Sequence, residues 1–509
     1  MLFNSFFFIL IFLPITLIGW YWLGGRDRRR LSRLFLICMS LWYYGAFGRQ
    51  YLGVLAVSLV MNRALALWGA RLRAGDGIRR GPSSPSADLA QLRSGGGNAN
   101  GPQTSGVIAL AVIFNLLWLG FFKYVPSLDN RFSSIAMPVG LSFYTFSLLS
   151  YVIDVCRGDI PTGSLLEYVL FAVYFPKLAE GPIARWQEVM PSFENKAAGH
   201  ADPDNIVRGF VLFVLGMAKK VLLADLIAPA AANGFQNGAL LDTGSVIVTV
   251  AAYAFQLYWD FSGFCDMGMG ISRMLGIDLP LNFDSPFKAP SFSVFWQKWH
   301  MSLTGFFTRY VYIPLGGSRR GTRRTCMNIM IVFFLSALWH GTGGTYVVWG
   351  LLSGALVAAC NLTLRRRAAQ AAGRELAALR GLTFAVFAFT LIFFGAPDLV
   401  HAMYMLRRLF MPMWPGWIFH MAGSLSIPFF YPLEKAVSIL CPGFLQWVQL
   451  GELAALVFIS FILVYGRRNA REIAWTCSLR RRNAVLLGIL FTACLLQLTG
   501  VSTFLYFKF

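Results

Sequence analysis

Two histidines lie close together in a chain that is otherwise mostly apolar. They occur in the segments WQKWHMS, residues 296–302, and LWHGT, residues 338–342, and all 509 residues contain only five histidines. A neutral imidazole can accept the proton of a hydroxyl group while that oxygen attacks an acyl carbon. His340 is therefore a candidate general base, and the alternative is a core histidine whose ring is bonded to a backbone carbonyl.

For His300, which stands between Trp299 and Met301, both a catalytic role and simple aromatic packing stay open. Further candidates for lining a substrate channel are Trp296, Trp299, Ser302, Trp339 and Asp266. The remaining histidines, which lie in a mixed-charge loop and in a stretch that reads as external, are expected to be bystanders: His200, His401 and His420.

The elements that must position these side chains are predicted to be membrane helices. Hydrophobic residues make up 57% of the chain and charged residues 13%, a balance that a water-soluble globule could not cover with polar surface. Apolar runs long enough to span about 30 Å of hydrocarbon recur throughout, for example at 2–23, 33–47, 106–122, 206–221 and 484–498. We predict an all-α polytopic membrane protein with about 12 transmembrane helices, forming one domain over residues 1–509.

The segment 285–317 interrupts this pattern because prolines, glycines and charged residues are mixed with its aromatic residues. Irregular backbone at membrane depth is tolerated only inside protein or along a wet cavity, which predicts a re-entrant or buried segment around a central channel. His340 follows Arg324 by sixteen residues, about 24 Å of helix, and is therefore expected to lie inside the bilayer. An ionisable residue at that depth is a functional candidate.

The net charge of +21 is concentrated in five loops, at 24–33, 71–93, 319–324, 365–380 and 467–482. Basic bias in short loops marks the cytoplasmic side and, with all five loops inside, both termini are predicted to be extracytoplasmic. No nucleic-acid partner is expected, since the arginines are dispersed at helix ends without a reading module. Residues 74–106 are poor in apolar side chains and are predicted to form a flexible cytoplasmic loop.

Four acidic residues fall in or beside apolar runs and are expected to pair structurally with basic residues such as Lys177, Lys219 and Arg273. The four are Asp154, Glu180, Asp260 and Asp266. The eight cysteines are scattered without a C-x-x-C pair, which signals neither a metal site nor a disulfide framework.

Several segments together resemble the membrane-bound O-acyltransferases. They are WDFSGFCDMGMG (259–270), NFDSPF (282–287), FWQKWHMSL (295–303), YIPLGG (312–317) and LWHG (338–341), supported by PVGLSFYTF (138–146), FPKLAEGPI (175–183) and FLYFKF (504–509). Each motif alone is weak, but together they are specific and cover most of the chain. Within the family, the bacterial alginate O-acetylation branch is the most similar.

The resemblance implies a helical enzyme of the bacterial inner membrane in which His340 is catalytic and His300 is a second active-site histidine. It implies an acyl group taken from a cytoplasmic thioester, acetyl-CoA, without a bound cofactor. It also implies transfer towards an extracellular polysaccharide, alginate-like or cellulose-like, with help from an extracytoplasmic acetyltransferase partner. The chain departs from the pattern at Thr308-Arg309, at Gly395 and at Glu180, which bears on the acceptor and partner surface more than on acyl transfer.

Two alternatives stay open at this point. A related branch transfers D-alanyl groups from a carrier protein to teichoic acid, although the YIPLGG form favours the acetyl branch. A transporter or exporter, with buried charges along a substrate path, would also need many crossings. The lack of a visible internal repeat and the clustering of polar residues in one segment weigh against transport.

Overall fold

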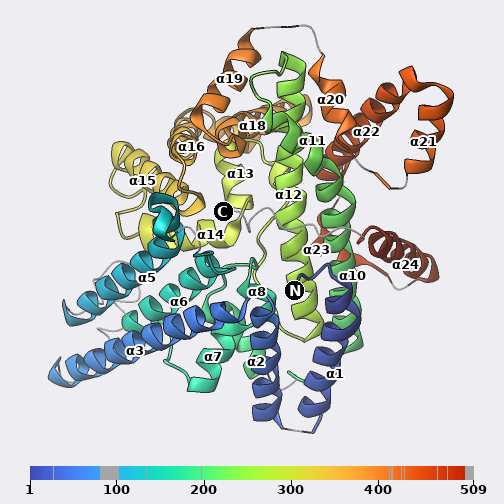
Figure 1. The fold of residues 1–509 in the computed structure, drawn as a ribbon. Coiled ribbons are helices and arrows are strands. Elements are labelled where there is room, and N and C mark those ends of the chain that lie inside the picture. Colours follow the sequence, from blue (N-terminus) through green and yellow to red (C-terminus); the bar gives the residue numbers. More distant parts are fainter. Residues whose placement is uncertain are drawn as a thin grey trace. The chain divides into compact units, whose positions relative to one another are not determined.

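The computed structural model describes residues 1–26, 28–80, 102–132, 135–195, 198–411, 413, 416–425, 427–428, 430–466, 468–478 and 480–498. Over these residues the regular structure is helical throughout (Figure 1). The chain divides into two compact units. The first holds mainly residues 10–206 with 275–280, and the second holds mainly residues 207–274 and 281–509 with residues 2–9.

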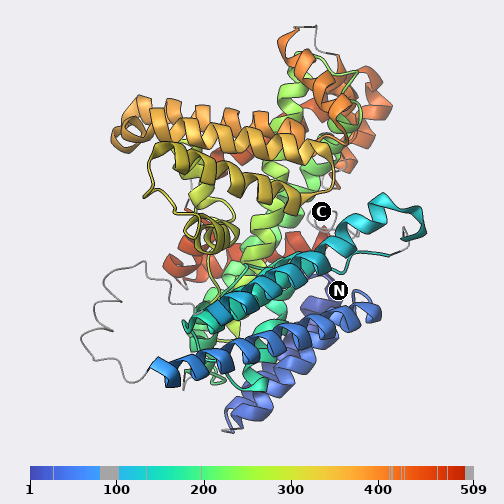
Figure 2. The same ribbon diagram turned by 90° about the vertical axis from the view of Figure 1, so that its left-hand side faces the viewer.

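The first unit is a helical bundle. Within it, α3, α5 and α6 pack against one another, and α1 packs against α2 (Figures 1 and 2). Its helices are α1 (Leu13–Gly24), α2 (Arg29–Gly45), α3 (Arg49–Arg80), α5 (Pro102–Leu128), α6 (Leu141–Arg157), α7 (Leu165–Val173), α8 (Phe175–Leu178), α9 (Trp186–Glu194) and most of η1 (Phe8–Phe12).

The predicted loop at 74–106 has helical ends, since α3 continues to Arg80 and α5 begins at Pro102. Residues 81–101, at its centre, lie outside the described residues, as do residues 504–509, one of the segments that carried the family resemblance.

The second unit is built around the long helix α12 (Thr243–Met274). Around it lie helices α10 (Pro203–Ala218), η3 (Lys219–Ala224), α11 (Asp225–Gln236), α13 (Phe292–Lys298), α14 (Met301–Phe307), η5 (Thr308–Tyr312), α15 (Thr322–His340), α16 (Gly344–Thr363), α17 (Arg365–Gln370), α18 (Gly373–Gly395), α19 (Leu399–Phe410), α20 (Trp417–Gly423), α21 (Tyr431–Leu440), α22 (Leu445–Gly466), α23 (Ala470–Thr476) and α24 (Arg481–Leu496). The pair α15 and α16 packs side by side (Figure 2).

Within the part of the chain that the structure describes, five helical stretches are long and apolar enough to cross a membrane, which identifies a polytopic membrane protein. These stretches are Arg49–Ala74, Thr104–Leu128, Gly344–Thr363, Gly373–Gly395 and Pro442–Gly466. One shorter apolar helical stretch, Phe8–Gly24, overlaps the run predicted at 2–23. The count of about 12 crossings stays a prediction, as does the organisation into one domain.

Helices α10 and α12 meet backbone to backbone through glycine. A Cβ added at Gly216 would lie 2.7 Å from the carbonyl oxygen of Gly263, and one at Gly209 would lie 2.5 Å from that of Gly270. Small residues let membrane helices approach this closely and replace side-chain contacts with dense backbone packing. The contact fixes the register between the end of α10 and α12, and so fixes which side chains beyond Gly216 and Gly263 face each other.

The segment 285–317 consists of short pieces, as its composition predicts. Helices α13 and α14 have seven residues each, and the wide turn of η5 follows directly. None of these three could span a bilayer. The placement of the segment as a re-entrant loop stays a prediction.

Candidate active site

Both histidines line one cavity in the second unit, which we call the histidine cavity. Its volume is about 260 Å³. Apart from His300 and His340, its walls include the aromatic side chains of Trp296 and Trp299 and the hydroxyls of Thr304 and Ser336. The sequence placed the two histidines forty residues apart, and the fold brings them to the same space.

His340 is the last residue of α15, a helix that runs without interruption from Thr322 and so confirms the helix predicted between Arg324 and His340. The side chain is buried, with 5% of its surface exposed. Aromatic rings surround the imidazole, since its centroid lies 4.6 Å from Trp339, 5.1 Å from Trp349 and 5.2 Å from Phe394. This packing holds the ring in place at one end of the cavity.

His300 connects α13 to α14 with a left-handed backbone, φ +47°. Only Ser285 and His300 combine a side chain with positive φ among the described residues. Such a conformation costs about 1–3 kcal/mol and persists where the surroundings impose it. Phe261 packs edge-on against the imidazole, with ring centroids 4.7 Å apart.

The surroundings that hold His300 come from segment 282–284. The backbone amide of Met301 donates to the carbonyl of Asn282 over 2.9 Å, and the amide of Asp284 donates to the carbonyl of Lys298 over 3.0 Å. The Asn282 side chain adds three contacts through its Oδ1 atom. These join Oδ1 to His300 Nδ1 at 3.2 Å, to the Ser302 amide nitrogen at 3.1 Å and to Ser302 Oγ at 2.9 Å.

The other predicted channel residues have different surroundings. Trp296 and Trp299 line the histidine cavity, whereas Ser302 is bonded to Asn282 as described. Trp339 is buried beside both imidazoles, 5.9 Å from His300 and 4.6 Å from His340 between ring centroids. Asp266 lies elsewhere, paired with Lys219 Nζ at 2.5 Å.

A more polar cavity of about 720 Å³ adjoins the histidine cavity, and we call it the polar cavity. The two share Ser293, Gln297, Tyr312, Ile329 and Asn361 as lining residues, and Ser293 Oγ donates to Asn361 Oδ1 over 2.8 Å. The polar cavity also borders residues 318, 321 and 322, in and beside the basic loop predicted to be cytoplasmic. Ser293, Asn361 and Thr304 carried no signal in the sequence that marked them.

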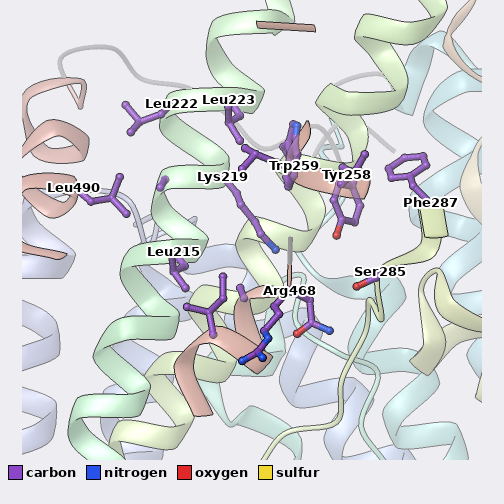
Figure 3. A pocket seen from close by; sticks show the side chains of 16 residues that line it. Leu215, Lys219, Leu222, Leu223, Tyr258, Trp259, Ser285, Phe287, Arg468 and Leu490 are labelled. Carbon is purple, nitrogen blue, oxygen red and sulfur yellow. The ribbon is translucent and has the colours of Figure 1, made fainter. Parts of the chain in front are cut away.

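A third cavity, of about 400 Å³, is mainly aliphatic and is called the lysine cavity here. Figure 3 shows the Lys219 side chain extending into it, with Trp259 and Tyr258 on one side and Arg468 nearby. The adjacent Lys220 is buried and bonds both Asp260, at 2.6 Å, and Asp225, at 2.8 Å. The predicted structural pairing of Asp260 and Asp266 with lysines is thus confirmed.

The pairing predicted for Asp154 and Glu180 stays a prediction. Other contacts are described for these residues and for Lys177 and Arg273. Asp154 accepts from Gln187 Nε2 at 3.2 Å, and Glu180 is buried. Lys177 Nζ lies 4.2 Å from the Phe171 ring centroid, and the Arg273 guanidinium lies 5.4 Å from that of Trp475.

The predicted bystander histidines are not among the residues that line the histidine cavity. His200 and His420 are exposed, and His401 bonds Asp398 at the start of α19. The backbone amide and the ring of His401, as hydrogen-bond partners, hold the pKa of the Asp398 carboxyl below its usual value.

The structure shows what surrounds two of the departures from the family pattern, Gly395 and Arg309. A Cβ at Gly395 would lie 2.5 Å from the Phe235 ring, so glycine leaves room for that ring. Arg309 lies in η5 with its guanidinium 5.9 Å from the Tyr310 ring centroid.

Fold and cavity together describe a polytopic helical membrane protein with two histidines facing one buried space. Residues 35–406 match the membrane-bound O-acyltransferase family, MBOAT, a region that contains both histidines. The chain belongs to this family and is an O-acyltransferase.

Similar proteins include acetyl-transferring members. The chain is 32% identical over 390 residues to a peptidoglycan O-acetyltransferase of Helicobacter pylori, covering 70% of this chain and 69% of the relative. It is 34% identical over 375 residues to the "Probable alginate O-acetylase AlgI" of Azotobacter vinelandii, covering 70% and 68%. A teichoic acid D-alanyltransferase of Streptococcus thermophilus is 25% identical over 272 residues, covering 51% and 65%.

Proposed function

We propose that this O-acyltransferase transfers acetyl groups from acetyl-CoA, taken from the cytoplasm, to a glycan hydroxyl outside the bacterial inner membrane. The observation that carries the proposal is the shared cavity of His300 and His340. Identities of 32–34% with acetyl-transferring relatives, against 25% with a D-alanyl-transferring one, favour the acetyl group. The acceptor expected from the sequence is an alginate-like or cellulose-like polysaccharide. An extracytoplasmic acetyltransferase partner is expected to help deliver the acetyl group to it.

In the proposed step His340 acts as general base. Its imidazole accepts the acceptor's hydroxyl proton while the hydroxyl oxygen bonds to the thioester carbonyl carbon. The carbon–sulfur bond then breaks, and the proton passes from His340 to the departing sulfur, which leaves as the thiol of coenzyme A. The products are the acetyl ester and the free thiol, and His340 returns to its neutral form.

The polar cavity is the proposed route for the donor. It lies next to the histidine cavity and borders the loop after η5, whose arginines 319, 320, 323 and 324 would attract the phosphates of coenzyme A. This arrangement would let the thioester reach His340 from the basic side of the protein. The acceptor would then approach from the opposite side.

The test is acetyl transfer in membrane vesicles given radiolabelled acetyl-CoA and a soluble glycan acceptor. The His340→Ala variant should lose transfer to the acceptor, whereas His200→Ala, at an exposed histidine, should retain it. Equal label transfer by wild type and His340→Ala would remove His340 from the mechanism. Transfer seen only with a D-alanyl-loaded carrier protein would replace the acetyl proposal by the teichoic acid alternative.

Flux assays address the transport alternative. Glycan export from proteoliposomes that contain no acyl donor, unaffected by His340→Ala, would contradict the proposal in favour of an exporter. We expect no such flux.

A further inference from the structure

We propose that Asn282 fixes His300 in a single tautomer, so that His300 Nε2 binds the acceptor's hydroxyl and not the thioester carbonyl. This inference rests on the proposed function for its substrate, although the tautomer itself does not. Asn282 is thereby a positioning residue, acting through His300. The sequence contained it in the NFDSPF motif without indicating any role.

The orientation of the Asn282 amide follows from its neighbour. The backbone N–H of Ser302 can only donate, and it lies 3.1 Å from the side-chain atom assigned as Oδ1. A flipped amide would place an NH₂ group against that N–H, which two donors cannot satisfy. The atom is therefore the carbonyl oxygen, and Ser302 Oγ donates to the same atom over 2.9 Å.

The tautomer of His300 follows from the amide. Asn282 Oδ1 has no hydrogen to give, and His300 Nδ1 lies 3.2 Å from it. Nδ1 must carry the proton and donate it to this bond. In the neutral ring the other nitrogen, Nε2, then holds a lone pair.

A neutral ring is the form that this site favours. His300 is 2% exposed and packs against the edge of Phe261, and a buried imidazolium would cost considerable free energy. The lone pair on Nε2 can accept a hydrogen bond from a hydroxyl. It cannot donate one to a carbonyl oxygen or to an oxyanion, so the group that meets it must bring its own proton.

Of the two substrates, the acceptor is the one whose reacting group carries a proton. His300 Nε2 would hold the hydroxyl in place, and His340, which lines the same cavity, would take its proton during attack. A second active-site histidine could serve either the acyl carbonyl or the acceptor. The hydrogen bonds of Asn282 favour the acceptor.

Further hydrogen bonds hold Asn282 and the main chain of His300 in this arrangement. Asn282 is fully buried, and its Nδ2 also donates to Cys265 Sγ over 3.2 Å, which anchors the amide from α12. The backbone bonds between 282–284 and 298–301 hold the ring's own main chain in its left-handed conformation.

Nitrogen-15 NMR of the full-length protein with labelled histidines, in lipid and without substrate, tests the tautomer. His300 signals are assigned as those lost in His300→Gln. Wild type should show a protonated Nδ1 and a bare Nε2. Asn282→Leu, similar in size but without an acceptor, should shift the ring towards the Nε2-protonated form, and Asn282→Asp, which keeps an acceptor oxygen, should restore the wild-type pattern.

Kinetics test the substrate assignment. Asn282→Leu should lower kcat/KM for the glycan acceptor by about 10- to 100-fold, the size expected for one lost buried hydrogen bond, while the KM for acetyl-CoA stays near wild type. Asn115→Leu is the matched control, because it removes a buried side-chain amide that is bonded to Asn62 and makes no contact with His300, and it should leave kcat/KM near wild type.

Each possible result decides something. A protonated Nε2 in wild-type protein, or an unchanged tautomer in Asn282→Leu, would overturn the tautomer inference. A rise confined to the acetyl-CoA KM would overturn the acceptor assignment. Absence of acetyl transfer in wild type with the expected NMR pattern would instead refute the proposed function and leave the tautomer standing.

Discussion

The histidine cavity and the lysine cavity lie in the same compact unit, but their buried polar side chains have different kinds of partner. Beside the lysine cavity, Lys219 is paired with Asp266 at 2.5 Å, and next to it Lys220 is held by two carboxylates. In the histidine cavity, the Nδ1 atom of His300 lies 3.2 Å from the neutral side-chain amide of Asn282. Charged pairs hold the helices beside the lysine cavity together, whereas the histidine that lines the other cavity is bonded to an uncharged amide.

The largest effect is expected when an imidazole is removed from the histidine cavity. His340→Gln should reduce acetyl transfer by about 10²- to 10⁴-fold, the usual contribution of a general base. The thermal unfolding midpoint in detergent should stay within error of wild type, because the amide keeps much of the volume. Activity that survives together with a lowered midpoint would assign His340 to packing instead.

The next largest effect is expected when a carboxylate partner of Lys220, beside the lysine cavity, is removed. Asp260→Ala leaves Lys220, 1% exposed, with Asp225 as its remaining carboxylate partner of the two described. Loss of a buried partner typically costs about 3–5 kcal/mol, which should appear as a lower unfolding midpoint and a lower yield. Transfer per folded molecule should change little.

The control for that variant is an exposed pair of the same chemistry. Arg131 bonds Asp129 at 2.7 Å but is 83% exposed, and Arg131→Ala should leave the midpoint unchanged. Equal effects of the two substitutions would show that burial does not decide the strength of these pairs.

A third substitution tests the close glycine contact between α10 and α12. Gly216→Ala puts a methyl group 2.7 Å from the Gly263 carbonyl, and we expect a loss of about 1–3 kcal/mol in thermal unfolding as α10 and α12 separate. Gly451→Ala is the matched control, since a Cβ there meets nothing within 4 Å. A destabilised control with a stable Gly216→Ala would contradict the packing described for α10 and α12.

The smallest effect is expected at the border of the histidine and polar cavities. Ser293→Phe should narrow the space shared by both and raise the KM for acetyl-CoA by about 10-fold, or about 1.4 kcal/mol, with unchanged stability. Ser318→Phe lines the polar cavity alone, at an exposed position, and should have little effect. The reverse order of KM values would rule out this route for the donor.

The sequence predicted the parts of this site that depend on local pattern. The uninterrupted helix up to His340 and the broken helices of 285–317 both followed from composition and spacing. That Asp266 pairs with a basic residue was also predicted, because a buried carboxylate needs a cation, but the choice of Lys219 was not.

Other parts depend on tertiary detail that no local pattern encodes. Asn282 reaches His300 across eighteen residues because two backbone bonds fold one segment over the other. Lys219 and Lys220 are adjacent at the start of η3, yet Lys219 pairs with Asp266 and Lys220 pairs with Asp225 and Asp260. Neither register could be read from residue types alone.

The left-handed main chain at residue 300 bears on what an engineered substitution there would do to stability. Glycine adopts positive φ without steric cost, so replacement of His300 by glycine would relieve part of the backbone's conformational penalty while deleting the ring. Because the ring is buried, its removal would also leave a cavity whose cost offsets this gain, so a library screened for heat resistance alone should show no strong preference for glycine at that codon.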